Sequence, residues 1–190
     1  IMEDSEYQGV RLSLDAYLDK TRIPLKIDIS TGDVITPCEI SFSYQLMFEN
    51  RTIPLLAYPP ETVLAEKLET ILSRGEANTR LRDFYDVYIL QREDFVVTPD
   101  ALRYALLATC RKRGHEDLLH TYASILDRVR QSDTMRTQWM KYQSDFDYAA
   151  GITWDTVLDT VETLCMKTLD DHAFGDELPQ EESQFEMHLL

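Results

Sequence analysis

The sequence predicts an α+β fold, in which a region of short strands is followed by a series of helices. Residues 9 to 58 contain runs in which apolar and polar side chains alternate, the period of a β-strand. From residue 61 onward the apolar side chains recur every three or four residues, the period of an amphipathic helix. Pro59 and Pro60 separate the two patterns, because proline is favoured at the first position of a helix.

Four strands are expected in the first region, at residues 10–14, 23–30, 40–48 and 52–58, with turns at 31–33 and 49–51. Strict alternation over residues 23–30 places Asp28 in the middle of a polar strand face. Aspartate is uncommon inside strands, so Asp28 indicates either a functional carboxylate or an ordinary side chain on a solvated face.

Six helices are expected after the strands, at residues 61–72, 79–91, 99–113, 116–130, 133–143 and 153–169. The hydroxyls of Thr98 and Thr153 are suited to cap the helices that follow them, and Gly114 is suited to end the third. Residues 170–190 contain seven acidic side chains and no lysine or arginine, a composition typical of a mostly disordered tail.

Lys67 falls inside the apolar stripe of the first predicted helix, where an aliphatic side chain is expected. The second helix is apolar almost all round except for a narrow seam of Arg82, Asp83 and Asp86. Because unpaired buried charge is costly, both helices are expected to direct these charges into one shared polar site. If Lys67 is a desolvated cation there, Lys67→Met should preserve the fold and even raise the melting temperature.

A simpler alternative needs no functional site. Lys67 could extend its ammonium to solvent along the apolar face, while Arg82 and Asp86 form an ordinary i, i+4 helix pair. The coincidence of Lys67, Arg82, Asp83 and Asp86 within twenty residues favours the shared site over this alternative.

Two segments, KIDISTGD (residues 26–33) and YPPETVLAEKLETILSRGEANTRLRDFYDVYIL (residues 58–90), resemble the AbiEii/AbiGii nucleotidyltransferase toxin family of abortive-infection and type IV toxin–antitoxin systems. The K-x-D strand, the E-x-x-x-A-E-K helix and the R-D-x-Y-D helix follow the family's order and spacing. The resemblance covers residues 6–90 well. It extends more loosely to the later helices, beginning with LRYALLATCRKRGHE at residues 102–116.

The resemblance implies a partial polymerase-β-like nucleotidyltransferase sheet with helices, followed by a helical C-terminal lobe. It also implies Mg²⁺ as cofactor and a nucleoside triphosphate as substrate, with Asp28 close to the metal and Lys67 facing the triphosphate. Asp83 and Asp86 fall on the family's fourth motif, and the sequence does not distinguish which of them is catalytic. These residue types suit phosphoryl-type transfer, which needs oxygen ligands for Mg²⁺ and fixed cations against phosphate charge.

Basic side chains beside these motifs are candidates for substrate binding. Lys26 begins the K-x-D motif, and Arg74, Arg80 and Arg82 cluster around the predicted site. They are expected to guide the triphosphate or an RNA acceptor end, with a solvated basic face as the alternative. The basic run at residues 111–113 is better explained by the dipole at the end of its helix.

The chain departs from the family pattern before the first motif. Family members carry a Gly-Ser loop and a D-x-D pair ahead of the K-x-D strand, and nothing before Lys26 fits them. The expectation is therefore a C-terminal part of a longer protein, inactive alone, with its N-terminal metal-binding part missing. Its divisions would be a nucleotidyltransferase-like portion at 1–97, a helical lobe at 98–169 and a tail at 170–190. The other D-x-D, at residues 145–147, is expected in a loop or at a helix end.

The composition of the chain argues against several classes of protein. A net charge of −15 argues against a large nucleic-acid-binding face, although it leaves a local one open. No apolar run approaches a membrane span and no signal-peptide pattern is present, so a cytoplasmic protein without a membrane partner is expected. The three widely spaced cysteines suit reduced core positions.

Three functional hypotheses follow. The first is a toxin that transfers a nucleotide to RNA or another cellular target, with an antitoxin encoded nearby. The second is a truncated, non-catalytic remnant that still binds a nucleotide or a partner. The third is a helical interaction module whose acidic tail recruits a basic partner, but it leaves Lys67 and Asp28 unexplained.

Overall fold

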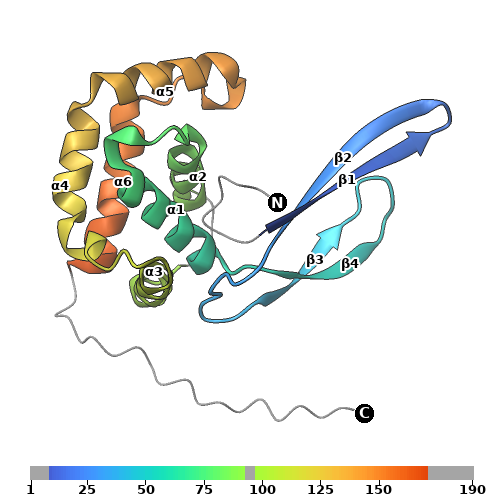
Figure 1. Ribbon diagram of the computed structural model, residues 1–190, viewed down its shortest axis with the longest axis horizontal. Helices are drawn as coiled ribbons and strands as arrows, with labels where there is room; N and C mark the ends of the chain where they lie inside the picture. Colours follow the sequence, from blue (N-terminus) through green and yellow to red (C-terminus); the bar gives the residue numbers. More distant parts are fainter. Residues whose placement is uncertain (1–8, 93–96, 171–190) are drawn as a thin grey trace, which may run out of the picture. The chain divides into compact units, whose positions relative to one another are not determined.

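The computed structural model describes residues 9–92 and 97–170 of the 190-residue chain and is mixed α+β, with strands preceding helices as predicted (Figure 1). The chain divides into two compact units, Ile1–Val34 and Ile35–Leu190. The expected disordered tail, apart from its first residue, lies outside the described residues.

The first unit is an antiparallel hairpin of β1 (Gly9–Leu18) and β2 (Thr21–Ser30). Both strands are longer than predicted, because the chain reverses at Asp19 and Lys20 instead of ending β1 at residue 14. Asp19 adopts φ 53°, a conformation that aspartate tolerates better than most residues. The predicted turn at residues 31–33 does not join paired strands, since β2 pairs only with β1.

One face of this hairpin is apolar and the other polar, as the alternation predicts. The register sets Leu12 opposite Ile27 and Arg11 opposite Asp28. The large apolar side chains of the first face are 42–58% exposed: Val10, Leu12, Leu14, Ile23, Leu25, Ile27 and Ile29. A two-stranded hairpin has no second layer of its own, so this face is not covered within the unit.

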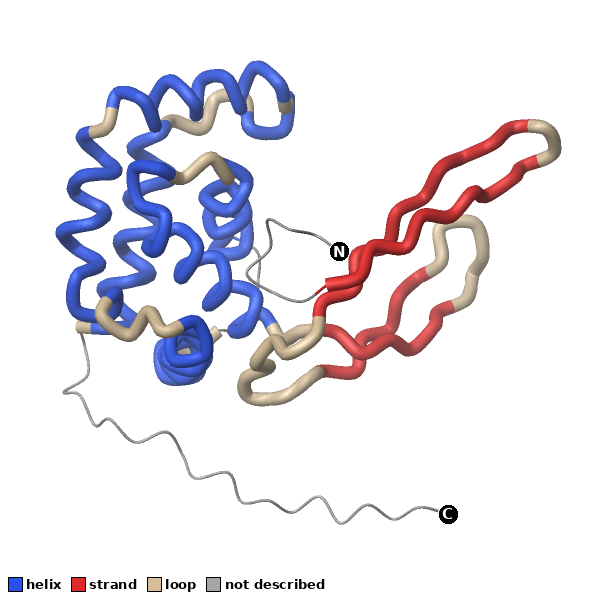
Figure 2. Tube along the Cα trace, viewed as in Figure 1, coloured by secondary structure: helices blue, strands red, loops and turns tan. Residues whose placement is uncertain are grey.

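The second unit begins with another antiparallel hairpin, β3 (Ile40–Gln45) and β4 (Thr52–Ala57), drawn in red with the first hairpin in Figure 2. β3 ends three residues earlier than predicted. The Gln45 side chain explains this, because its amide donates to the carbonyls of Leu46, Glu49 and Arg51 and closes a loop where the strand was expected to continue.

Six α-helices follow in the described residues: α1 (Pro60–Arg74), α2 (Leu81–Arg92), α3 (Pro99–Arg113), α4 (Leu118–Gln131), α5 (Asp133–Asp145) and α6 (Trp154–Leu169). Two 3-10 turns, η1 (Gly75–Ala77) and η2 (Asp147–Ala149), lie between them. The predicted caps are confirmed, since Thr98 and Thr153 accept from the backbone N–H of Ala101 and Thr156. Asp145 ends α5 and Asp147 begins η2, so the D-x-D segment is a helix end as expected.

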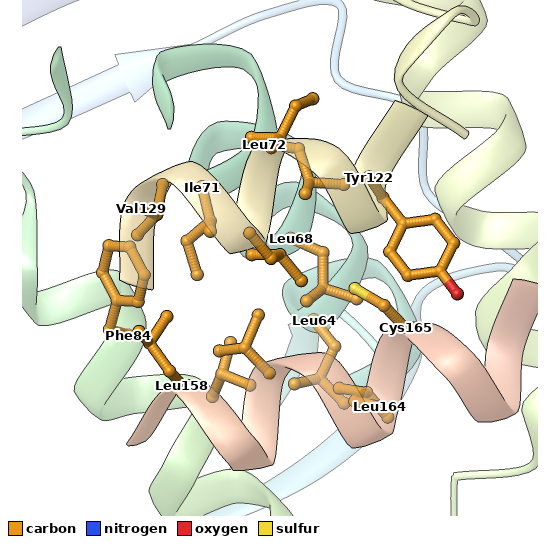
Figure 3. Packing of buried hydrophobic residues seen from close by; sticks show 14 of the residues in the cluster. Leu64, Leu68, Ile71, Leu72, Phe84, Tyr122, Val129, Leu158, Leu164 and Cys165 are labelled. Atoms are coloured by element: carbon orange, nitrogen blue, oxygen red, sulfur yellow. The ribbon is translucent and has the colours of Figure 1, made fainter. Parts of the chain in front are cut away.

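The helices share one apolar core, in which side chains of α1, α4 and α6 meet (Figure 3). Leu64, Leu68 and Ile71 of α1 are fully buried against Val129 of α4 and Leu158 of α6, among others. α1 also packs on α2 and α3. This packing fixes the position of α1, and with it Lys67, relative to α2.

The cysteine prediction is confirmed at two positions and wrong at the third. Cys110 and Cys165 are buried in the helical core, whereas Cys38 is exposed in the connection between β2 and β3. Among the described helices, none has both the length and the apolar character needed to span a membrane.

Candidate functional site

A short connection brings α1 and α2 side by side. Gly75 ends α1 with φ 48°, and its N–H donates to the Ile71 carbonyl. Asn78, which is fully buried, donates its backbone N–H to the Gly75 carbonyl and accepts from the Arg80 N–H at 2.7 Å through Oδ1. Asparagine forms such local turns readily, so α2 begins at Leu81, shortly after α1 ends at Arg74, and packs along α1.

Lys67 of α1 lies between two carboxylates of α2. Its Nζ is 2.6 Å from Asp86 Oδ2 and 3.1 Å from Asp83 Oδ1, and it donates a hydrogen bond to each. The Lys67 side chain is 19% exposed, Asp86 24% and Asp83 6%. Charge-assisted hydrogen bonds are strong where water is partly excluded, so they hold the Lys67 ammonium in one position. The two helices do direct their charges to one shared site, with each other as partners.

Two arginines extend this cluster toward solvent. Arg80 Nε lies 3.1 Å from Asp83 Oδ2, within ion-pair distance but without the alignment of a hydrogen bond. Arg82 Nε lies 3.8 Å from Asp86 Oδ2, and its side chain is 77% exposed. The i, i+4 pair therefore exists alongside the shared site and does not replace it. Three cations meet two carboxylates here, which leaves a local charge of +1 in a strongly acidic protein.

The remaining predicted site residues are one exposed arginine of α1 and two residues of the first unit. Arg74 is exposed at the end of α1, two helical turns and about 10 Å along the axis from Lys67. Lys26 and Asp28 belong to the first unit, on the polar face of its hairpin. Asp28 accepts from Arg11 through both oxygens, one at 2.8 Å, and this hydrogen bonding lowers the pKa of the Asp28 carboxyl below its usual value.

The carboxylates of the described residues do not by themselves form the oxygen cage that Mg²⁺ requires. No group of three or more histidine, cysteine, aspartate or glutamate side chains in this part of the chain could hold a metal ion. Asp83 and Asp86 bind Lys67, and Asp28 binds Arg11. These carboxylates bind cationic side chains in this structure, so we derive no catalytic step through a metal.

Comparison with known proteins decides the family. A family model described as nucleotidyl transferase AbiEii toxin, type IV TA system, matches residues 1–160. The chain belongs to the AbiEii family. The match includes the later helices up to part of α6, beyond the residues 6–90 whose motifs carried the resemblance. No curated protein and no solved structure matches the chain.

One buried ionic cluster of this AbiEii chain was not predicted. Glu69 of α1 is 1% exposed and binds Arg113 at the end of α3, and its Oε1 lies 2.6 Å from His115 Nδ1. Arg113 does lie in the last turn of α3, where the helix dipole favours a cation, but it is only 13% exposed and is also paired with Glu69. The available signal was Glu69 itself, a carboxylate one position after Leu68 in the apolar stripe, as unexpected there as Lys67.

An aromatic group beside α2 was also missed. Tyr85 of α2 contacts Tyr148 of η2 with ring centroids 4.8 Å apart, and Tyr142 and Phe146 from α5 and its end complete the group. The spacing of the last three in sequence, four and two residues, was the signal that could have identified it.

Proposed function

We propose that this AbiEii-family toxin transfers a nucleotide from a nucleoside triphosphate to RNA or another cellular target, and that Lys67 binds the triphosphate. The observation that supports this most is the position of the Lys67 ammonium, which Asp83 and Asp86 hold where α1 and α2 meet. We call this partly exposed cluster, with Arg80 and Arg82, the seam between α1 and α2. A cation fixed before substrate arrives stabilises developing phosphate charge without a reorganisation cost.

The ammonium retains hydrogen-bonding capacity for a substrate. A lysine ammonium carries three N–H bonds, and two are directed to Asp83 and Asp86. The third can be donated to a phosphate oxygen. With Arg80 and Arg82 adjacent, the net positive charge favours an anionic group at this place.

The two carboxylates are proposed to have different roles. Asp83 is 6% exposed and is held between Lys67 and Arg80, which suits a positioning residue. Asp86 is 24% exposed, so it is the carboxylate that a substrate can approach. We assign the catalytic part to Asp86, as the group that accepts a proton from an attacking hydroxyl.

The remaining assignments follow the family. Arg74, Arg80, Arg82 and Lys26 would bind substrate phosphates, and Asp28 would serve the Mg²⁺ that nucleotidyltransferases use, after release from Arg11. A toxin of a type IV system implies an antitoxin as partner and a cytoplasmic target. The assignments of Lys26, Arg74 and Asp28 do not depend on the seam between α1 and α2, whereas those of Arg80 and Arg82 do.

A second candidate is a non-catalytic member that binds a nucleotide or a protein partner. The pairing of every carboxylate in the seam with a cation favours this candidate, because such networks also occur as purely structural features.

The experiment is a transfer assay on the protein encoded by the complete gene, with labelled nucleoside triphosphates, total bacterial RNA and Mg²⁺. We expect label in the RNA, loss of label with EDTA, and strong reduction by Asp86→Asn. Asp28→Asn should also reduce transfer but leave the unfolding midpoint unchanged, since the Arg11–Asp28 pair is exposed. Binding of nucleotide without any transfer would support the second candidate instead.

A further inference from the structure

An exposed group of aromatic rings lies beside the proposed triphosphate site. We define the aromatic platform as Tyr85 of α2, Tyr142 of α5, and Phe146 and Tyr148 around η2. Neighbouring centroids are 4.8 Å apart for Tyr85–Tyr148 and for Tyr142–Phe146, and 5.4 Å for Phe146–Tyr148. Phe146 is 42% exposed and Tyr148 51%, so part of the platform faces solvent.

The platform is firmly supported by the core. The hydroxyls of Tyr142 and Tyr148 are hydrogen-bonded at 2.9 Å, which joins α5 to η2. Beneath them Trp139, 1% exposed, stacks on Tyr142 at 5.4 Å, and its ring N–H donates to the Ile152 carbonyl. Rings held this way lose little entropy when a ligand stacks on them.

The platform is continuous with the charged seam. Tyr85 directly precedes Asp86, the Lys67 partner, in α2. Arg82 lies three residues before Tyr85 on α2, so the two side chains are neighbours on one side of the helix. Arg82 is exposed, so an accessible cation lies beside the platform at the edge of the seam.

We infer that the aromatic platform binds unpaired bases of a single-stranded RNA end, whose backbone then runs toward Arg82 and the Lys67 seam. This inference rests on the proposed function and names the acceptor's chemical class. Aromatic faces beside basic side chains are how proteins hold single-stranded nucleic acid without reading its sequence. Paired bases are already stacked in a duplex, so a duplex would not engage the rings.

The local charges set the direction of the strand. Arg82, 77% exposed, is three residues from Tyr85 on α2, while Asp145 and Asp147 flank Phe146 in the sequence. Phosphates are attracted to Arg82 and repelled by Asp145 and Asp147. The acidic remainder of the chain explains why the RNA would contact only this small area.

The test is fluorescence anisotropy with the full 190-residue chain, no nucleoside triphosphate, and a short fluorescein-labelled single-stranded oligoribonucleotide or its blunt duplex. We expect tighter binding of the single strand. Phe146→Ala and Tyr148→Ala should each weaken it by about 5-fold or more, the loss of one stacked base. Phe146→Tyr and Tyr148→Phe, which keep a ring, should bind as the wild type does, and so should Tyr104→Ala on α3.

Two further variants guard against misfolding and non-specific effects. Phe146→Leu keeps the apolar volume without an aromatic face and should still lose binding. Arg82→Gln should lower the slope of log affinity against log salt by about 0.7, the contribution of one phosphate on a single strand. Equal binding of strand and duplex, no binding by the wild type, or full binding by Phe146→Leu would overturn the inference.

The two experiments distinguish failure of this inference from failure of the proposed function. RNA binding that depends on the platform, together with no label transfer, would refute the transferase and leave the platform. Label transfer that is unaffected by Phe146→Ala and Tyr148→Ala would refute the platform and leave the transferase.

Discussion

The Lys67 ammonium on α1 lies 2.6 Å from the Asp86 carboxylate on α2 and donates a hydrogen bond to it. The pair joins two helices that a short connection already places side by side, and Asp83 shares the same ammonium. The geometry explains why a lysine is tolerated among apolar side chains, since its charge is compensated where it is partly desolvated. It also gives the seam a cation in a fixed position.

Lys67→Met should destabilise the fold by about 1–3 kcal/mol, because it leaves Asp83 and Asp86 without their shared cation. Adding Asp83→Asn and Asp86→Asn to it should restore most of the loss, since no uncompensated carboxylate then remains. Urea unfolding measures the free energy of unfolding of the single and the triple variant. Lys112→Met, at an exposed position of α3, is the matched control and should change stability by about 0.5 kcal/mol at most. A stabilised Lys67→Met protein would refute this account of the seam.

Glu69→Gln should lower the free energy of unfolding by about 3–5 kcal/mol, more than Lys67→Met does. The reason is that Arg113 is nearly buried and would lose its carboxylate partner. His115 would lose its contact in the same variant. The control is Arg136→Gln, which breaks an exposed pair with Asp155 and should cost about 1 kcal/mol at most. Similar unfolding midpoints for the two variants would contradict the importance of the Glu69 cluster.

Burial raises the pKa of the Cys110 and Cys165 thiols to about 12. At pH 8 a thiol reagent should therefore modify Cys38 rapidly and the two core cysteines only after unfolding. Cys38→Ser should abolish the fast reaction. Because the unfolded thiols ionise first, stability should fall as pH rises from about 9 toward 12 and be unaffected by these groups below that window. Rapid modification of all three cysteines in folded protein would contradict the core.

Local periodicity was sufficient to predict the helices and the α+β class, and the helical spacing alone predicted that Lys67, Asp83 and Asp86 would meet. The reversal at Asp19 was missed because Asp19 has no adjacent glycine or proline, the residues that mark a turn most clearly. The Glu69–Arg113 pair joins residues 44 apart, a distance over which periodicity carries no information. The pairing of Lys67 with Asp83 and Asp86 also reverses the expected effect of Lys67→Met on stability. From the sequence alone, that substitution could be treated only as the removal of a desolvated cation.

The central claim is that Lys67 acts on the triphosphate of the substrate, and the most direct test is kcat/KM for nucleotide transfer by Lys67→Met beside Lys112→Met. Circular dichroism first establishes that both variants are folded. The account predicts a fall of about 100-fold or more for Lys67→Met, the size of effect expected when a fixed group that stabilises transition-state charge is removed, and no change for Lys112→Met. Equal kcat/KM values in the two folded variants would contradict it.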